Sequence, residues 1–216
     1  IKLIDNAEIK VSNQFKTRIF EVTRGYPYSL NWFITALNIL GISTFDLLQE
    51  YATRKESIEE FIIKKIYATI PVGHKKLLWI LSTIRHGIDE KHISKLNTGE
   101  NVLESLEYLK ARYFISDNNG SLYVKDFIKD IIYPQIPVTD KIKVHKYLHD
   151  LYAEQIPVKP TERMFNISRK SMHEEQYYHF IRSSKNEKEY KSIGQNHPYS
   201  GLRSSNDFAY IVSTPV

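Results

Sequence analysis

Cysteine is absent from this chain of 216 residues. That absence excludes disulfide bonds and thiolate metal sites, and it is typical of a cytoplasmic protein. Long apolar runs are missing as well: none approaches the roughly 18 residues that a membrane helix needs, and no signal peptide opens the sequence. We therefore expect a cytoplasmic protein with no membrane partner. Because the chain begins at Ile1 without a Met, we also expect it to be a fragment of a longer protein.

The motifs of several enzyme classes are missing too. The sequence has no Gly-x-x-x-x-Gly-Lys phosphate-binding loop, no Gly-x-Ser-x-Gly nucleophile turn and no cysteine nucleophile. Its Asp, Glu and His residues form no recognisable catalytic constellation. We therefore assign no catalytic residue, and we expect no catalysis by this chain alone.

The charge is basic but spread evenly. The chain has 30 Lys and Arg against 25 Asp and Glu, a net charge of +5. The first 124 residues hold 16 basic and 14 acidic residues, and the remainder holds 14 and 11. A nucleic-acid-binding arm would concentrate the excess, so this distribution argues against one.

Helical periodicity dominates the first 56 residues, which we interpret as a small helical bundle. Apolar stripes run through residues 11–22 and 30–40, and a short helix is expected over Thr44–Ala52 with Thr44 as its N-cap. Gly25 ends the first helix, and Pro27 suits the first turn of the second because its missing N–H is not needed there.

Residues 57–136 change from a helical period to a strand period. Helices are expected near 58–70, 77–84, 89–96 and 101–112, and the helix at 101–112 places Val102, Leu103, Leu106 and Leu109 inward. Strand-like residues 113–116 and 121–124 flank Asp117-Asn118-Asn119-Gly120, a strong hairpin signal. Helices followed by a hairpin predict a winged helix.

Residues 137–216 predict further helices over 140–155 and 171–182, then a weakly periodic tail from Lys191. The predicted fold class is therefore mainly α: a helical bundle, a winged helix with a small β-hairpin, and further helices. The predicted domains are 1–56, 57–136 and 137–216.

Three segments carry a family resemblance, which extends over roughly residues 1–185. Arg24-Gly25-Tyr26-Pro27 resembles the Gly-x-Pro motif in the lid of STAND-class signalling ATPases, a class related to AAA+ ATPases that includes the NACHT and NB-ARC groups. The helices around 77–84 and 103–109 with the hairpin resemble the winged helix of that family. Residues 144–148 and 173–180 resemble the first helices of its sensor region.

The resemblance implies a regulatory role in signal transduction. In the family the motif proline packs on bound ATP or ADP, so Gly25 and Pro27 would contact nucleotide. The family commonly has Met-His-Asp after the wing, whereas this chain has Val124-Lys125-Asp126. Lys125 could meet a phosphate as a point charge, but it cannot act as a switchable imidazole. Implied partners are the missing nucleotide-binding core, other proteins and further copies in self-assembly.

Plainer interpretations of these residues stay open. Gly25 and Pro27 could simply end one helix and begin the next. Lys125 could be a solvated charge beside a strand end, and Asp126 could be the N-cap of a helix that begins at Phe127.

A DNA-binding winged-helix regulator is the alternative function. Its third helix would enter the major groove. A DNA or partner face would then include these residues: Lys91, Lys95, Asn101, Ser105, Lys110 and Arg112. The carboxylates of Glu100, Glu104 and Glu107 on the same helix would oppose DNA phosphates, so we favour a protein partner.

His145 and His149 stand four residues apart, a spacing that lets two imidazoles share zinc on one helix face. The glutamate of the metalloprotease motif is missing, since Lys146 follows His145. We therefore interpret both as ordinary helix-face histidines and predict no metal site.

Overall fold

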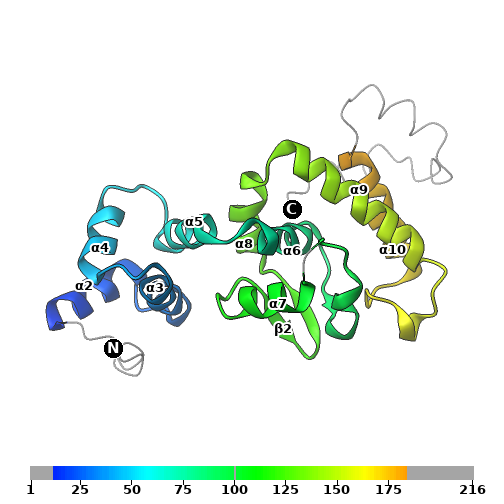
Figure 1. Cartoon of the computed structure of the whole chain (residues 1–216). Helices are drawn as coiled ribbons and strands as arrows, with labels where there is room; N and C mark the ends of the chain where they lie inside the picture. The colour runs from blue at the N-terminus through cyan, green and yellow to red at the C-terminus, as the bar shows by residue number, and fades with distance from the viewer. Residues whose placement is uncertain (1–11, 100, 184–216) are drawn as a thin grey trace. The chain divides into compact units, whose positions relative to one another are not determined.

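A computed structural model describes residues 12–99 and 101–183, which divide into two compact units between Pro71 and Val72 (Figure 1). The tail from Lys191 and the first predicted apolar position, Val11, lie outside the described residues.

The first unit is entirely helical in its described part. It contains α2 (Asn13–Thr23), α3 (Pro27–Leu40), α4 (Thr44–Ala52) and α5 (Ile58–Thr69). The side chains of Ser43 and Ser57 cap α4 and α5, because each accepts a hydrogen bond from the backbone N–H three residues later. Thr44, the predicted N-cap of α4, is therefore the first residue inside that helix.

The core of the first unit lies between α3 and α5. Trp32 and Phe33 of α3 and Ile62, Ile63 and Ile66 of α5 are fully buried. This packing places α5 in the first compact unit, which ends at Pro71 rather than at the predicted boundary of 56. The apolar periodicity of α5 predicts a buried face but does not indicate which element packs against it.

The turn between α2 and α3 rests on two consecutive left-handed residues. Arg24 has φ of 52° and Gly25 has φ of 70°, and the Gly25 N–H donates to Phe20 O at 3.1 Å. The Phe20 ring occupies the space that a Cβ on Gly25 would fill. Pro27 then begins α3. Glycine is thus needed here both for its φ and for the aromatic ring lying against it.

The second unit contains a winged helix. Its elements are α6 (Val72–Thr83), β1 (Ile88–Asp89), η1 (Glu90–Lys95), α7 (Val102–Lys110), β2 (Ser116–Asn118) and β3 (Ser121–Tyr123). The strands form an antiparallel sheet in the order β1-β3-β2, with Leu122 of β3 opposite both Ile88 and Asp117. The predicted winged helix is confirmed, and it includes a strand, β1, that the sequence analysis did not anticipate.

The hairpin turn is shorter than predicted. Asn118 pairs with Ser121, which leaves Asn119 and Gly120 as a two-residue turn with φ of 53° and 79°. The first strand of the hairpin, β2, also begins later than predicted. Tyr113 has φ of 61°, and its N–H and that of Phe114 bond back to Lys110 and Leu109, so residues 113–114 terminate α7.

An antiparallel helix pair completes the second unit. After α8 (Asp126–Ile132) and η2 (Tyr133–Gln135) come α9 (Val138–Gln155), η3 (Pro160–Glu162) and α10 (Arg169–Ser183). α9 and α10 lie side by side and run in opposite directions, since His145 meets His179 while His149 meets Gln176 (Figure 1).

The helix pair is joined to the winged helix. α9 packs on α6, and the segment before α10 bonds to β1 through the Asp89 N–H to Met164 O at 2.9 Å and an Ile88–Phe165 bridge. The compact unit therefore continues across the predicted boundary at residue 136.

We expect Gly25→Ala to destabilise the first unit by about 1–2 kcal/mol. The left-handed backbone conformation is unfavourable for alanine, and the added Cβ would clash with the Phe20 ring. Adding Phe20→Ala should reduce the further cost of Gly25→Ala to the conformational part alone. Denaturation followed by Trp32 fluorescence in a Trp79→Phe background measures both. Equal costs of Gly25→Ala with and without Phe20 would contradict the proposed ring contact.

Candidate functional site

The turn between α2 and α3 exposes three apolar side chains to solvent. Tyr26 is 62% exposed and Phe20 is 54% exposed, and Pro27 is exposed beside them. The sequence analysis selected Gly25 and Pro27 but missed Phe20. The spacing in the sequence could have revealed Phe20, because an aromatic residue five positions before a left-handed glycine can place its ring against that glycine. Such a surface suits a planar ring or an apolar partner.

Lys125 lies at the start of α8, in the second unit. It is half-buried, and its backbone carbonyl accepts hydrogen bonds from the N–H groups of Ile128 and Lys129. Lys125 therefore occupies the N-cap position of α8, and Asp126 is the first helical residue instead of the cap. The Asp126 carboxylate pairs with Lys129 at 3.3 Å.

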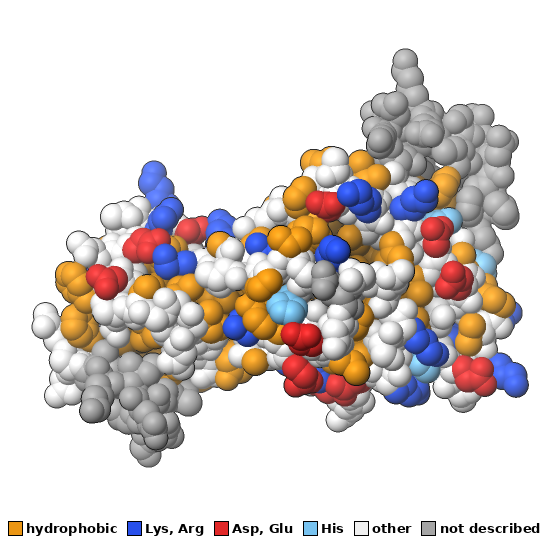
Figure 2. Space-filling view, viewed as in Figure 1, with side chains coloured by type: hydrophobic (Ala, Val, Ile, Leu, Met, Phe, Trp, Pro, Cys, Tyr) orange, Lys and Arg blue, Asp and Glu red, His pale blue; other side chains and the backbone are white. Residues whose placement is uncertain are grey.

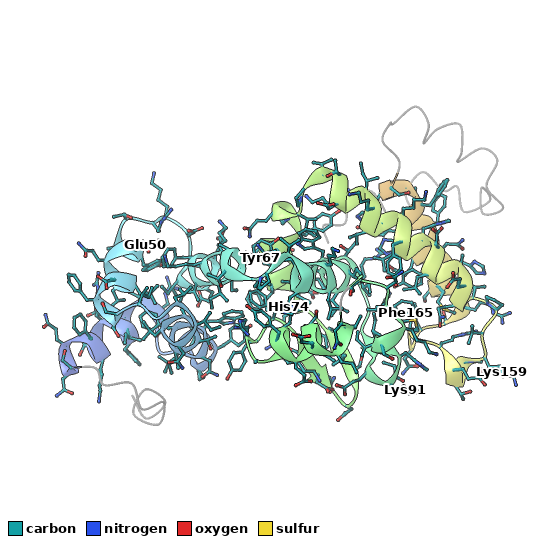
Figure 3. The ribbon with its side chains drawn as sticks, in the orientation of Figure 1. Glu50, Tyr67, His74, Lys91, Lys159 and Phe165 are labelled. Atoms are coloured by element: carbon teal, nitrogen blue, oxygen red, sulfur yellow. The ribbon has the colours of Figure 1, made fainter. Side chains whose placement is uncertain are left out.

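The predicted DNA or partner face carries cations that are already paired. Lys91 lies 2.7 Å from Asp89, and Lys110 lies 2.5 Å from Glu90 (Lys91 is labelled in Figure 3). The hydrogen bond that Lys110 donates to the Glu90 carboxylate raises the pKa of Lys110 above its usual value. Carboxylates of the same fold thus neutralise these ammonium groups.

The guanidinium group of Arg112 stacks on an aromatic ring. Its guanidinium carbon lies 3.4 Å from the centre of the Tyr108 ring, and Nη1 donates to Tyr108 O at 3.1 Å. The His74 ring also stacks on Tyr108, with 4.2 Å between the ring centres (His74 is labelled in Figure 3). Lys95 and Asn101 remain exposed, and Asn101 caps α7 through its side chain.

Two predictions about α7 are wrong. Ser105, assigned to the exposed face, is fully buried, and its hydroxyl lies 2.9 Å from His74 Nδ1. Leu103, assigned to the core, is 54% exposed. The Asn101 cap starts the helix so that Val102, Leu106 and Leu109 face inward. With 3.6 residues per turn, that register brings Ser105 to the inner face and turns Leu103 outward.

The outer surface of α7 is acidic. Glu104 and Glu107 are exposed, and Figure 2 shows red acidic side chains gathered over α7 and the hairpin. Glu100, the remaining predicted carboxylate of this helix, lies outside the described residues. This face therefore repels phosphate rather than attracting it.

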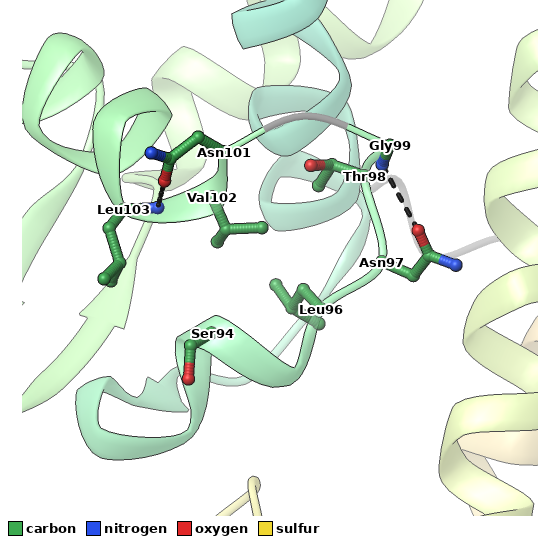
Figure 4. Close-up of a pocket in the computed structure, with 8 residues that line it drawn as sticks. All are labelled: Ser94, Leu96, Asn97, Thr98, Gly99, Asn101, Val102 and Leu103. Carbon is green, nitrogen blue, oxygen red and sulfur yellow. Dashed lines mark hydrogen bonds between the residues drawn. The ribbon is translucent and has the colours of Figure 1, made fainter.

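A cavity of about 540 Å³ lies between the end of η1 and the start of α7 (Figure 4). Its polar groups serve the local backbone: the Asn97 side chain accepts from the Gly99 N–H at 3.2 Å, and the Asn101 side chain accepts from the Leu103 N–H at 3.1 Å. Leu96, Val102 and Leu103 supply its apolar wall. None of the described residues that line this cavity is charged, so they offer a ligand few strong polar contacts.

A buried ion pair joins the winged helix to α10. Glu175 of α10 is 2% exposed and faces Arg85, which follows α6. Arg85 Nη2 lies 2.6 Å from one carboxylate oxygen, and Nε donates to the other at 3.2 Å. His86 also approaches Glu175, at 3.3 Å. Burial acts to lower the pKa of Arg85, but the Glu175 carboxylate more than offsets this and raises it.

Two histidines continue this buried network. His145 of α9 and His179 of α10 contact each other through their Nδ1 atoms at 2.8 Å, and His145 Nε2 lies 2.9 Å from the Tyr133 hydroxyl. Burial lowers the pKa of His145 to about 3, aided by Arg182 and Lys141. Burial also lowers the pKa of His179 well below its usual value. Both imidazoles are therefore neutral near pH 7.

The proposed i, i+4 partner of His145 points elsewhere. His149 lies 3.0 Å from Asp150 and beside Phe180, while His145 is held by Tyr133 and His179. The imidazoles of His145 and His149 therefore contact different residues. In residues 12–99 and 101–183, no three His, Cys, Asp or Glu side chains are grouped so that they could hold a metal ion.

In the described part of the chain, no single helix is long and apolar enough to span a membrane; α3 and α4 reach that length and composition only as a pair bent by 116°. Comparison with protein-family models, curated proteins and solved structures gave no match. The function is therefore inferred from the residues themselves.

We expect Glu175→Gln to destabilise the second unit by about 2–4 kcal/mol, because it leaves Arg85 without a charged partner in a largely buried position. Glu174→Gln is the matched control on the same helix, since Glu174 only approaches Lys170 at 3.8 Å on the surface. Its cost should stay below about 0.5 kcal/mol. Denaturation followed by Trp79 fluorescence in a Trp32→Phe background measures both, and equal costs would contradict the buried pair.

The histidine pair predicts acid sensitivity. Because the folded-state pKa values lie below the unfolded value of about 6.5, the unfolded chain binds more protons below that pH, and stability falls as pH falls. Each histidine contributes a slope of up to about 1.4 kcal/mol per pH unit between about pH 6.5 and pH 5. His145→Gln should remove one such contribution, measured by denaturation at several pH values. An unchanged slope in His145→Gln would contradict this prediction.

Proposed function

We propose that this chain is the regulatory lid and winged-helix module of a STAND-type signal-transduction ATPase. It would couple the nucleotide state of the parent protein to a C-terminal sensor through domain rearrangement. One observation carries the proposal: an exposed Gly-x-Pro turn in a helical bundle is followed, in order, by a winged helix and an antiparallel helix pair.

The turn would supply the nucleotide contact. Pro27, with Tyr26 and Phe20 exposed beside it, offers an apolar surface against which a base or ribose of ATP or ADP could pack. The phosphates and the hydrolytic chemistry would belong to the nucleotide-binding core of the parent protein. Lys125 places a cation in the second unit at the sequence position where the family has its phosphate-contacting histidine.

The second unit would transmit the signal as one body. The helix pair is fixed to the winged helix by the Glu175–Arg85 pair and by the backbone bonds between β1 and the segment before α10. A ligand or partner acting at the sensor side would therefore move the winged helix with it. Binding energy could then shift the population from a closed, nucleotide-bound state to an open, assembling one.

The alternative, a DNA-binding regulator, fits the winged-helix fold but not its charges. Lys91 and Lys110 pair with carboxylates of the same fold, Arg112 is stacked on Tyr108, and Glu104 and Glu107 lie on the outer face of α7. DNA affinity depends on cations that replace counterions along the phosphates. This surface suits a protein partner better.

The gene upstream of Ile1 provides the first test. We expect a Gly-x-x-x-x-Gly-Lys-Ser/Thr loop about 150–250 residues earlier, the distance of one domain. In the full gene product, Pro27→Ala should weaken ADP binding about tenfold, because one apolar ring contact is lost while alanine still begins a helix well. Isothermal titration calorimetry measures the affinity.

Pro160→Ala is the matched control, since Pro160 is an exposed proline at the start of η3. Its ADP affinity should equal that of the parent protein. A start codon at Ile1, or unchanged ADP affinity in Pro27→Ala, would refute the proposal. A salt-dependent affinity for duplex DNA in the nanomolar range would favour the alternative.

A further inference from the structure

A second cavity, of about 350 Å³, lies inside the second unit between α6, the Asn97–Thr98 turn and α9. Residues from the winged helix line one side and residues from the helix pair line the other. Its volume falls at the lower end of the range typical of small-molecule sites. A ligand bound there would touch both parts of the unit at once.

Two aromatic side chains line this cavity. Trp79 comes from α6 and Tyr147 from α9, and both are only partly exposed. The Tyr147 hydroxyl accepts a hydrogen bond from the Asn97 N–H at 3.0 Å, which fixes the tyrosine against the turn. Burial raises the pKa of Tyr147, so its ring stays neutral at physiological pH. Fixed neutral rings favour contact with a planar apolar group.

Lys76 adds a cation to the lining of this cavity. Lys76 of α6 is half-buried, and in the described part of the chain no carboxylate lies within ion-pair distance of it. Its Nζ lies near the turn, because a Cβ added to Gly99 would stand 3.6 Å from it. On the other side Lys143 is already paired with Asp140 at 3.1 Å. Among the described lining residues, two lysines and one aspartate therefore leave a net charge of +1.

We propose that this cavity binds a small planar aromatic carboxylate. The ring would lie against Trp79 and Tyr147, and the carboxylate would pair with Lys76. A net charge of +1 matches a monoanion, whereas DNA or a polyphosphate would need several cations. This site is separate from the Gly-x-Pro turn and does not rest on the proposed nucleotide contact.

Such a ligand would act as an effector of the second unit. It bridges α6 and α9, so its binding would stabilise the packing of the helix pair on the winged helix in proportion to the logarithm of its concentration. A small aromatic carboxylate would thereby control how stably the helix pair packs on the winged helix.

Tryptophan fluorescence tests the proposal directly. The chain has two tryptophans, and Trp32 is fully buried in the first unit while Trp79 lines the cavity. Titration of the full chain with benzoate, phenylacetate and 3-phenylpropanoate should give a saturable change in Trp79 fluorescence, with a Kd on the order of 1 mM for ligands of this size. Trp79→Phe should abolish the signal, which assigns it to the cavity.

Matched ligands and variants separate charge from ring. Benzamide and acetate, which lack the charge or the ring, should bind about tenfold more weakly or not at all. Lys76→Gln should weaken benzoate binding about tenfold and leave benzamide unchanged, and Lys76→Arg should retain binding. Lys95→Gln, which changes an exposed lysine outside the cavity lining, is the control and should bind as the parent does.

Several results would overturn the proposal. They are no saturable change with any of the carboxylates, equal affinity for benzoate and benzamide, or unaltered benzoate binding in Lys76→Gln. Binding of an acidic peptide such as acetyl-Asp-Phe-amide in place of the free carboxylates would assign the cavity to a protein partner instead. Circular dichroism of each variant confirms that a loss of binding is not a loss of folding.

Discussion

Glu175 is a carboxylate buried at 2% exposure, and the arrangement of the second unit depends on how its charge is satisfied. Burying a carboxylate is costly unless a cation and hydrogen bonds compensate it. Arg85 provides both through two contacts, and because it follows α6 while Glu175 lies on α10, the compensation requires the winged helix and the helix pair to stay together. The need to compensate the buried Glu175 charge thus holds the winged helix and the helix pair together.

The same logic governs the rest of this interface. His145 and His179 lie in direct contact and stay neutral because burial disfavours their charged forms, and Tyr133 completes the hydrogen bonding of His145. Around them the β1 backbone bonds to the segment before α10. A polar, geometrically demanding interface of this kind favours one packing over others. That property suits a part that passes a conformational signal without deforming.

Charge also decides how the winged-helix surface can be used. Of the cations that suggested a DNA face, Lys91 and Lys110 are paired with Asp89 and Glu90, and Arg112 is stacked on Tyr108. Lys76 differs because it is half-buried beside aromatic side chains and lacks an ion-pair partner among the described residues. A count of basic residues in the sequence treats all of these lysines alike. Only their neighbours in space separate a neutralised surface from a site with spare charge.

Local physical chemistry in the sequence determined most of the elements. Apolar periodicity located the helices, Gly25 and Pro27 marked the α2–α3 turn, and Asp117-Asn118-Asn119-Gly120 marked the hairpin, because each signal depends on residues close in the chain. Tertiary structure alone decided which faces are buried. It placed α5 in the first unit, buried Ser105 and exposed Leu103, since those outcomes depend on helix caps and packing partners. It also brought Arg85 to Glu175 and placed Lys76 and Tyr147 around one cavity. No local pattern encodes these arrangements, because the residues are distant in sequence and come together only when the helices pack.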